Sequence, residues 1–229
     1  IVNMNVIMNI IGTACKNDNV LICKLLLGIS SNIDIHHKDE LIFRYACQSG
    51  AFKIAEWVYL QGDTNISIND NDAFFKACYS NNAELILWLH GKIKTKIDYH
   101  KNNDELFRTC CQQNLVEAVL VLTTLTTFKL NIDKKFNDRF KYENEFHFFC
   151  RYGYIDIAKK YLNIKDFPIQ SKTNEAICLA CQEGHLEMAK WLYSLGANIY
   201  SQDNWCFEMG ITRNNLELLK WIHSLGKID

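Results

Sequence analysis

Cysteine and histidine are the residues of this sequence with the most obvious chemical potential, because ten cysteines and seven histidines occur among its 229 residues. Their side chains bind zinc and serve as nucleophiles or proton carriers. However, no pair of C-x-x-C motifs is present to assemble a tetrahedral zinc site. Six of the cysteines recur at a regular interval, so we interpret them as small apolar core residues. Free cysteines also indicate that the protein resides in an intracellular, reducing compartment.

Two short segments carry side chains that could bind a ligand. His36 and His37 are neighbours in a segment expected to be an extended tip, where adjacent side chains point apart. We therefore favour a solvated tip over a metal site there. The segment from Asp133 to Tyr142 alternates basic and aromatic residues. Three interpretations stay open for it: aromatic residues that pin the segment to the fold, a protein contact, and a platform for single-stranded nucleic acid.

Known catalytic motifs are absent from the sequence. It contains no G-x-S-x-G elbow, P-loop, H-E-x-x-H pair or kinase signature. The formal net charge is -1, which gives no global attraction to nucleic acid or to an anionic membrane. No run of about 18 apolar residues predicts a transmembrane helix. We therefore expect a protein that is not an enzyme, has no cofactor and no bound metal, and does not enter a membrane.

These residues lie in a repeated sequence pattern. When the copies of the pattern are aligned, seven residues share one column, and successive members of that column are 32, 31, 33, 39, 31 and 30 positions apart. Four positions before each member the residue is always Ile or Phe, and one position before, it is small in all copies but one. The small residues are expected where neighbouring helices touch, and the large ones between layers. The column consists of Cys15, Cys47, Cys78, Cys111, Cys150, Cys181 and Ile211.

The clearest copy, Asn174 to Gly196, predicts two short helices joined by a tight turn. Asn174 is a suitable N-cap for the first helix, and Gly184 ends it in a left-handed conformation. Each helix is too short to be stable alone, so the copies must bury their faces against one another. The apolar stripe expected in the second helix consists of Leu186, Ala189, Leu192 and Tyr193.

This pattern resembles the ankyrin repeat. The segment from Glu175 to Leu192, EAICLACQEGHLEMAKWL, follows the A-x-x-G-H-L-E-V-V-K-L-L part of that family's consensus. The T-P-L-H opening of the family is missing. The Gly184-His185 turn recurs in degenerate form, with asparagine in place of the glycine in three copies. Asparagine is the residue that next most readily adopts a left-handed conformation, so the replacement is physically reasonable.

The resemblance implies an all-α fold, an ankyrin-repeat solenoid of about seven helix-turn-helix repeats with finger loops, which we expect to form a single domain over residues 1–229. An insertion at about 123–142 lengthens the fourth period. Trp221 in the last repeat is expected to be covered by further residues, another protomer or another chain. The expected repeats are about 10–39, 40–71, 72–103, 104–142, 143–174, 175–204 and 205–229.

The variant of the repeat also suggests a source. A Trp-Leu pair in the second helix, a small-Cys pair in the first and Asn-Ile loops resemble the ankyrin proteins of giant amoeba viruses, the Mimivirus type. An amoeba or another eukaryote with an AT-rich genome is the alternative. The viral resemblance implies an intracellular protein of the host cytoplasm or the virion, with a host factor or another viral protein as its partner.

The favoured function is a non-catalytic scaffold for protein-protein interaction, with a concave surface made of finger loops and the exposed sides of first helices. The alternative is a structural or self-assembling component of a viral assembly, which associates through open terminal repeats. A protein partner of unknown identity is expected, and nucleic acid is not favoured. The expected partner-binding residues are His36, His37, Arg44, Gln48, Tyr79, Tyr99, His100, Arg108, Gln112, Lys134, Lys135, Arg139, Arg151, Tyr152, Gln170, Lys172, Tyr200 and Gln202.

Overall fold

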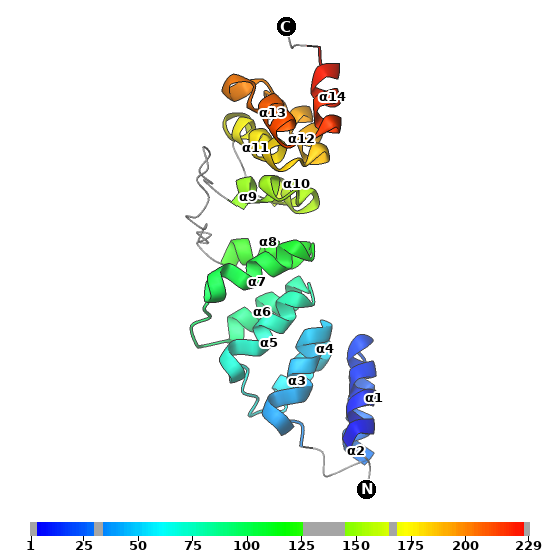
Figure 1. The fold of residues 1–229 in the computed structure, drawn as a ribbon. Coiled ribbons are helices and arrows are strands. Elements are labelled where there is room, and N and C mark those ends of the chain that lie inside the picture. The colour runs from blue at the N-terminus through cyan, green and yellow to red at the C-terminus, as the bar shows by residue number, and fades with distance from the viewer. Residues whose placement is uncertain (1–3, 30–33, 126–144, 165–168, 227–229) are drawn as a thin grey trace. The chain divides into compact units, whose positions relative to one another are not determined.

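The computed structural model describes residues 4–29, 34–125, 145–164 and 169–226, and these residues form α-helices with no strand (Figure 1). The all-α prediction is therefore confirmed over the described ranges. The chain divides into two compact units, Ile1–Thr127 and Phe128–Asp229. We describe each unit by itself, and the expectation of one continuous domain stays a prediction.

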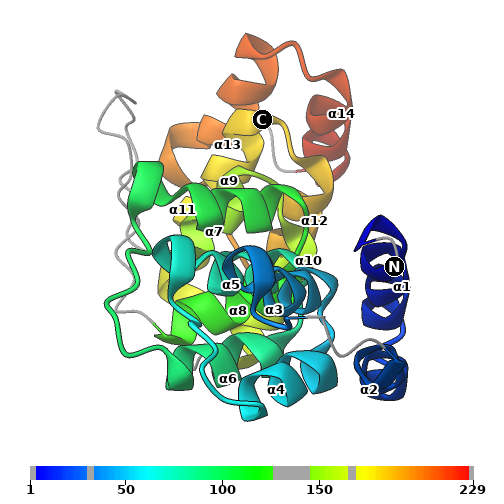
Figure 2. The same cartoon turned by 90° about the horizontal axis from the view of Figure 1, so that it is seen from below.

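Unit 1 is built from consecutive helix pairs, in which a first helix is followed by a tight turn and a second helix. The first helices pack on one another, α1 on α3, α3 on α5 and α5 on α7, and each second helix lies against its own first helix. Figure 2 shows the same pairs from below. The helices are α1 (Met4–Lys16), α2 (Val20–Ile29), α3 (His37–Ser49), α4 (Phe52–Leu60), α5 (Ile68–Tyr79), α6 (Ala83–Lys92), α7 (Lys101–Gln112) and α8 (Val116–Leu125).

Unit 2 follows the same plan. Its first helices are α9, α11 and α13, with α11 packed against both of the others, and α10, α12 and α14 are the second helices. The helices are α9 (Glu145–Arg151), α10 (Ile155–Ile164), α11 (Ile169–Glu183), α12 (Leu186–Ser194), α13 (Ser201–Thr212) and α14 (Leu216–Ser224).

The predicted column of large apolar residues forms the core of both units. Phe43, Phe74 and Phe107 in unit 1, and Phe146 and Ile177 in unit 2, are at most 1% exposed. Full burial of such a side chain contributes about 1.5–3 kcal/mol relative to leaving it in water. Ile11 of the first pair is also buried, whereas Phe207 of the last pair is partly exposed. Because the first six pairs each supply one such residue, they hold together through their shared core rather than through the short helices themselves.

The cysteines belong to this core. All ten are free and buried. Burial raises the pKa of the Cys15 thiol and of the Cys110 thiol to about 12, so both stay protonated at neutral pH. A protonated, buried thiol is a poor nucleophile and a poor metal ligand. The interpretation of the cysteines as small apolar residues is therefore confirmed.

The tight turns adopt the predicted left-handed conformation. The residue at the glycine position of the turn has a φ between +52° and +82° in six copies. This conformation costs most residues about 1–2 kcal/mol, whereas glycine adopts it freely and asparagine is the usual substitute. The six residues are Gly50, Asn81, Asn114, Gly153, Gly184 and Asn214.

Three details of the predicted helices are wrong. Asn174 is not an N-cap, because α11 already begins at Ile169, and the Asn174 side chain accepts a hydrogen bond from the Asn198 backbone N–H at 2.7 Å. The first helix begins at Met4, earlier than expected. The buried side chains of α12 are Met188, Ala189 and Leu192, whereas the Tyr193 side chain is 38% exposed.

The α8 helix continues further than its threonines suggest. It ends at Leu125, so Thr123 and Thr124 are helical rather than part of the inserted loop. Their hydroxyl groups donate to the carbonyls of Leu120 and Val121, both at 2.7 Å. These bonds satisfy the hydroxyl groups within the helix, which makes threonine tolerable there.

Candidate binding groove

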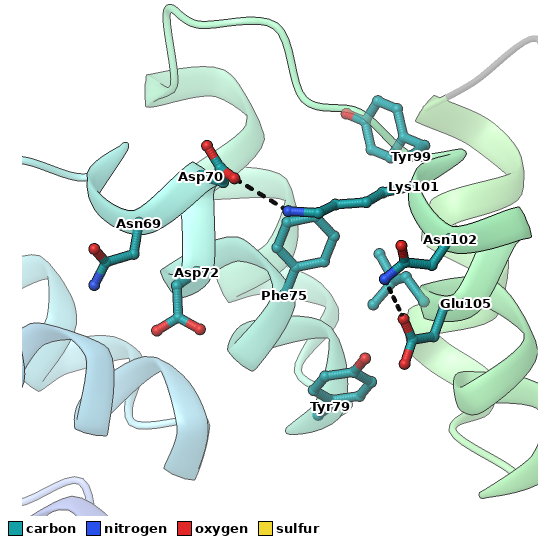
Figure 3. A pocket seen from close by; sticks show the side chains of 10 residues that line it. Asn69, Asp70, Asp72, Phe75, Tyr79, Tyr99, Lys101, Asn102 and Glu105 are labelled. Atoms are coloured by element: carbon teal, nitrogen blue, oxygen red, sulfur yellow. Dashed lines mark hydrogen bonds and ion pairs between the residues drawn. The ribbon is translucent and has the colours of Figure 1, made fainter.

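A groove with a volume of about 230 Å³ lies between α5 and α7 in unit 1 (Figure 3). The α5 wall presents the rings of Phe75 and Tyr79, which are four residues apart and therefore lie on one face of the helix. The α7 wall presents Asn102 and Glu105. The groove thus combines aromatic surface on one side with polar and acidic groups on the other.

The groove exists because an ion pair present between the preceding first helices is replaced here. Between α3 and α5, the Arg44 Nε atom donates to Asp72 Oδ2 at 2.6 Å. The equivalent positions one repeat further on are Phe75 in α5 and Glu105 in α7. A phenyl ring cannot bridge to a carboxylate as a guanidinium does, so the two side chains leave an open space between them.

The aromatic wall is accessible. Tyr79 is 40% exposed. Burial of the phenol raises the pKa of Tyr79, so the ring stays neutral at physiological pH. Phe75 is partly exposed beside it. The wall therefore offers flat apolar surface without a negative charge of its own.

The acidic side of the groove has one carboxylate that is not paired with a cation. Glu105 Oε2 accepts a hydrogen bond from Asn102 Nδ2 at 2.7 Å, and in the described part of the chain no Lys, Arg or His forms an ion pair with Glu105. At the upper end, Lys101 Nζ donates to Asp70 Oδ2 at 3.1 Å and connects α7 to α5 (Figure 3). Glu105 is thus the acidic group of the groove that is free to meet a ligand.

Comparison with known proteins identifies the repeats. Residues 106–203 match the family model described as "Ankyrin repeats (3 copies)". Residues 106–203 are therefore similar to three ankyrin repeats. The matched segment is less than half of the chain, and it includes helices of both units.

The chain was also compared with curated proteins and with solved structures. No curated protein matched the chain. Among solved structures, a similar one is the crystal structure of the human ASB11 ankyrin repeat domain, with 16% sequence identity, 82% of this chain and 84% of that chain covered, and a TM-score of 0.47.

Two of the predicted partner-binding residues lie in the groove. Tyr79 forms part of its α5 wall, and Tyr99 closes one end. The Tyr99 ring also packs edge-on against Phe74 with a centroid separation of 5.9 Å, so it belongs partly to the core of unit 1. Sequence reasoning missed Phe75, Asn102 and Glu105. Comparison of equivalent positions in the repeats could have found two of them, because Phe75 stands where the previous repeat has Arg44, and Glu105 stands where it has Asp72.

The finger histidines have partners within the chain. His36 Nδ1 lies 2.9 Å from Glu40 Oε2, and His100 Nδ1 lies 2.6 Å from Asp104 Oδ1. Both carboxylate residues are buried, with exposures of 4% for Glu40 and 0% for Asp104. The histidines therefore cover buried acids at the start of their helix pairs. The same column holds Ser67 in the intervening repeat, whose neighbour Thr95 bonds to the buried Asn71.

The predicted residues on the first helices differ in their accessibility. Arg44 is engaged with Asp72, and Gln48 is exposed and accepts a hydrogen bond from Lys76 at 3.1 Å. Arg151 was expected on an exposed side, but it is 4% exposed and its Nη2 atom lies 2.9 Å from Glu183 Oε1. That expectation was wrong because the next ankyrin repeat covers the arginine and supplies its counter-ion.

The remaining predicted residues are placed as follows. Arg108 is partly exposed, Gln112 is exposed, and Tyr152 is 36% exposed with its ring stacked on Tyr154. Tyr200 is partly exposed, but its hydroxyl oxygen is buried and has no hydrogen-bond partner in the described structure. Outside the described residues or side chains lie His37, Lys134, Lys135, Arg139, Gln170, Lys172 and Gln202.

The described residues form neither a metal site nor a membrane-spanning helix. Within the described ranges, no three His, Cys, Asp or Glu side chains are arranged to hold a metal ion. None of the helices described is both long enough and apolar enough to cross a bilayer.

Proposed function

We propose that the chain is a non-catalytic scaffold that binds a partner protein through the exposed side of its first helices. The ankyrin repeats support this proposal, because such repeats generally mediate protein interactions. The observation that carries it is the groove between α5 and α7, where Phe75 and Tyr79 remain accessible beside an acidic group. Aromatic residues in polar surroundings are the usual energetic anchors of protein interfaces.

The test is a quantitative capture experiment with two matched variants from the same ankyrin repeat. Tyr79→Ala removes an exposed side chain on the first helix, α5, and Leu87→Ala removes one that is 48% exposed on the second helix, α6. Proteins captured by the wild type and by Leu87→Ala, but lost with Tyr79→Ala, would support the proposed surface. Equal capture by all three forms would show that the groove side of the first helices is not the binding surface.

The alternative function is self-assembly through terminal repeats. It is favoured by two apolar side chains in the last helix pair, because Ile211 on α13 is 57% exposed and Leu216 on α14 is 59% exposed. Light scattering after size exclusion, over a wide range of concentrations, separates the two functions. A mass that grows with concentration in the wild type but not in Ile211→Glu would favour assembly. A constant monomer mass would leave the scaffold function in place.

The viral source and the compartment belong to this proposal as well. The resemblance of the repeats to ankyrin proteins of giant amoeba viruses supports a viral protein that acts in the host cytoplasm or in the virion, on a host factor or another viral protein. Sequencing of purified virions and of their host tests this origin. The coding sequence in the virion genome would support it, and the coding sequence in the host's own genome would contradict it.

A further inference from the structure

We propose that the groove between α5 and α7 binds an arginine side chain of the partner protein. This inference rests on the proposed scaffold function and names the group that the groove recognises. An unpaired carboxylate, an aromatic wall and an equivalent arginine site inside the same chain support it.

The charge balance favours a cation. Three carboxylates line the groove, those of Asp70, Asp72 and Glu105, and the lining residues in the described part of the chain include one cation, Lys101. Lys101 is paired with Asp70, and Asp72 is paired with Arg44 from the neighbouring α3. Glu105 therefore carries the charge that is left without a counter-ion. A positively charged ligand removes this imbalance, whereas an acidic ligand increases it.

The chain already contains an arginine–carboxylate pair of the kind that we infer. Between α3 and α5, one step earlier in the same stack, the Arg44 guanidinium occupies the site equivalent to the groove and donates to Asp72 at 2.6 Å. Between α5 and α7 the equivalent carboxylate, Glu105, is retained, but the equivalent arginine is replaced by Phe75. An arginine supplied by a partner would restore the missing half of this pair.

The aromatic wall distinguishes arginine from lysine. A guanidinium is planar and only weakly hydrated, so it stacks on aromatic faces while its edge donates two hydrogen bonds to a carboxylate. Phe75 and Tyr79 provide the aromatic faces, and Glu105 lies on the opposite wall (Figure 3). One oxygen of Glu105 is held by Asn102, which fixes the carboxylate at the groove and leaves the other oxygen to accept. Lysine offers a point charge without the stacking plane.

The size of the groove limits the occupant to one side chain. Its volume of about 230 Å³ lies below the range of about 300–1,000 Å³ that is typical of sites for drug-sized ligands. An apolar side chain of similar length would fill the space, but it would leave the Glu105 carboxylate desolvated without a partner, which is unfavourable. A single arginine satisfies both the aromatic wall and the acid.

The experiment uses the whole chain and a defined probe, N-acetyl-arginine amide, titrated by NMR against the backbone amide signals. We expect saturable shifts confined to α5 and α7, with a dissociation constant on the order of 1 mM, as for a ligand of this size. The neutral isostere N-acetyl-citrulline amide should bind about tenfold more weakly, since it lacks the charge. N-acetyl-lysine amide, with a free ε-amino group, should fall between them.

Two substitutions test the site itself. Glu105→Gln removes the unpaired charge from an exposed side chain and should weaken binding of the arginine probe about tenfold. Glu84→Gln, at an exposed position on the second helix α6, is the matched control and should leave binding unchanged. Phe75→Arg recreates the Arg44 arrangement within the chain and should abolish binding of the probe while the fold, followed by circular dichroism, is retained.

The outcomes separate this inference from the proposed function. Equal affinity for the arginine and citrulline probes, tighter binding of the lysine probe, shifts outside α5 and α7, or unchanged binding by Glu105→Gln would each overturn the arginine site. The scaffold function stands or falls with the Tyr79→Ala capture experiment. If a partner is lost with Tyr79→Ala but retained by Glu105→Gln, the proposed binding surface stands and the proposed arginine site is wrong.

Discussion

Asn82 Nδ2 donates a hydrogen bond to the Gly50 carbonyl oxygen at 2.9 Å, which ties the turn of one helix pair to the turn of the pair before it. The Oδ1 atom of the same side chain accepts from the Leu85 backbone N–H at 3.1 Å and caps α6. In unit 2, Asn215 makes the equivalent contacts with Gly184 and Leu218. One asparagine side chain thus both begins a helix and joins two repeats.

The two roles of Asn82 can be separated by substitution. Asn82→Asp keeps the acceptor that caps α6 but loses the donor to Gly50, so it should lower the free energy of unfolding by about 1 kcal/mol. Asn82→Ala loses both contacts and should cost about 2 kcal/mol. Urea denaturation followed by circular dichroism measures both values. Equal stability of the two variants would show that the bond between the turns contributes nothing.

The central phenylalanine of α7 gives a test of the stack in unit 1. Phe107 is 1% exposed, so Phe107→Ala should lower the free energy of unfolding by about 3–5 kcal/mol. Because coupling passes only between neighbouring repeats, we also expect the denaturation curve to separate into two transitions. Leu87→Ala, at an exposed position, is the control and should change stability by less than about 0.5 kcal/mol. A single unchanged transition in Phe107→Ala would refute the prediction.

The fold was predictable because its determinants are local and repeated. The spacing of Phe74 and Cys78 recurs in every copy, and both positions are buried in the first six copies. The seventh copy differs, because Ile211 at the cysteine position is 57% exposed. The left-handed turns were equally readable, since Gly50 and Asn81 are the residue types that this conformation selects. The start of α11 was not readable from Asn174, because that asparagine bonds to the following loop instead of its own helix.

The groove was harder to predict because it depends on side chains from two neighbouring repeats, where Phe75 replaces the arginine that would pair with Glu105. Phe75 follows the core residue Phe74 and is itself apolar, so its residue type alone predicts a core position; only its equivalence to Arg44 points to the exposed side. Its importance appears only when α5 and α7 are placed side by side and Glu105 is found without the arginine that Asp72 has. Conversely, His100 looked like a ligand-binding residue from its type, but its partner Asp104 lies within the chain.

A glycine in unit 2 tests the packing between turns. Gly153 has a φ of +73°, and a Cβ atom at this position would lie 2.6 Å from His185 Nδ1. Gly196 has a φ of +94°, but a Cβ atom there would meet nothing within 4 Å. Gly196→Ala should therefore cost about 1–2 kcal/mol for the backbone conformation alone, and Gly153→Ala about 1–3 kcal/mol more for the clash.

The double variant Gly153→Ala/His185→Ala checks the cause of this additional cost. Removing the imidazole removes the atoms that the new Cβ atom would meet, so the double variant should be more stable than the sum of the two single substitutions predicts. Urea denaturation of the four proteins gives the coupling energy. A coupling energy of zero would mean that the turn relaxes away from His185 and that packing between the turns is loose.

His185 also gives stability in unit 2 a dependence on pH. Burial of the ring lowers its pKa below the ordinary value of 6.5, and this outweighs the opposing effects of Glu183 and of the hydrogen bond to the Arg151 backbone. The unfolded chain therefore binds more protons than the folded chain between the two pKa values, so stability falls as the pH decreases below about 6.5. Above that range the imidazole is neutral in both states and has no effect on the pH dependence.

Asparagine is the natural replacement for testing this dependence, because Asn82 and Asn215 occupy the same position in other turns. The free energy of unfolding of His185→Asn should decrease less than that of the wild type between pH 7.5 and pH 5.5. All other titrating groups are shared by the two proteins, so the difference between their pH profiles isolates His185. Parallel profiles over this range would show that the ring is as well solvated in the folded state as in the unfolded state.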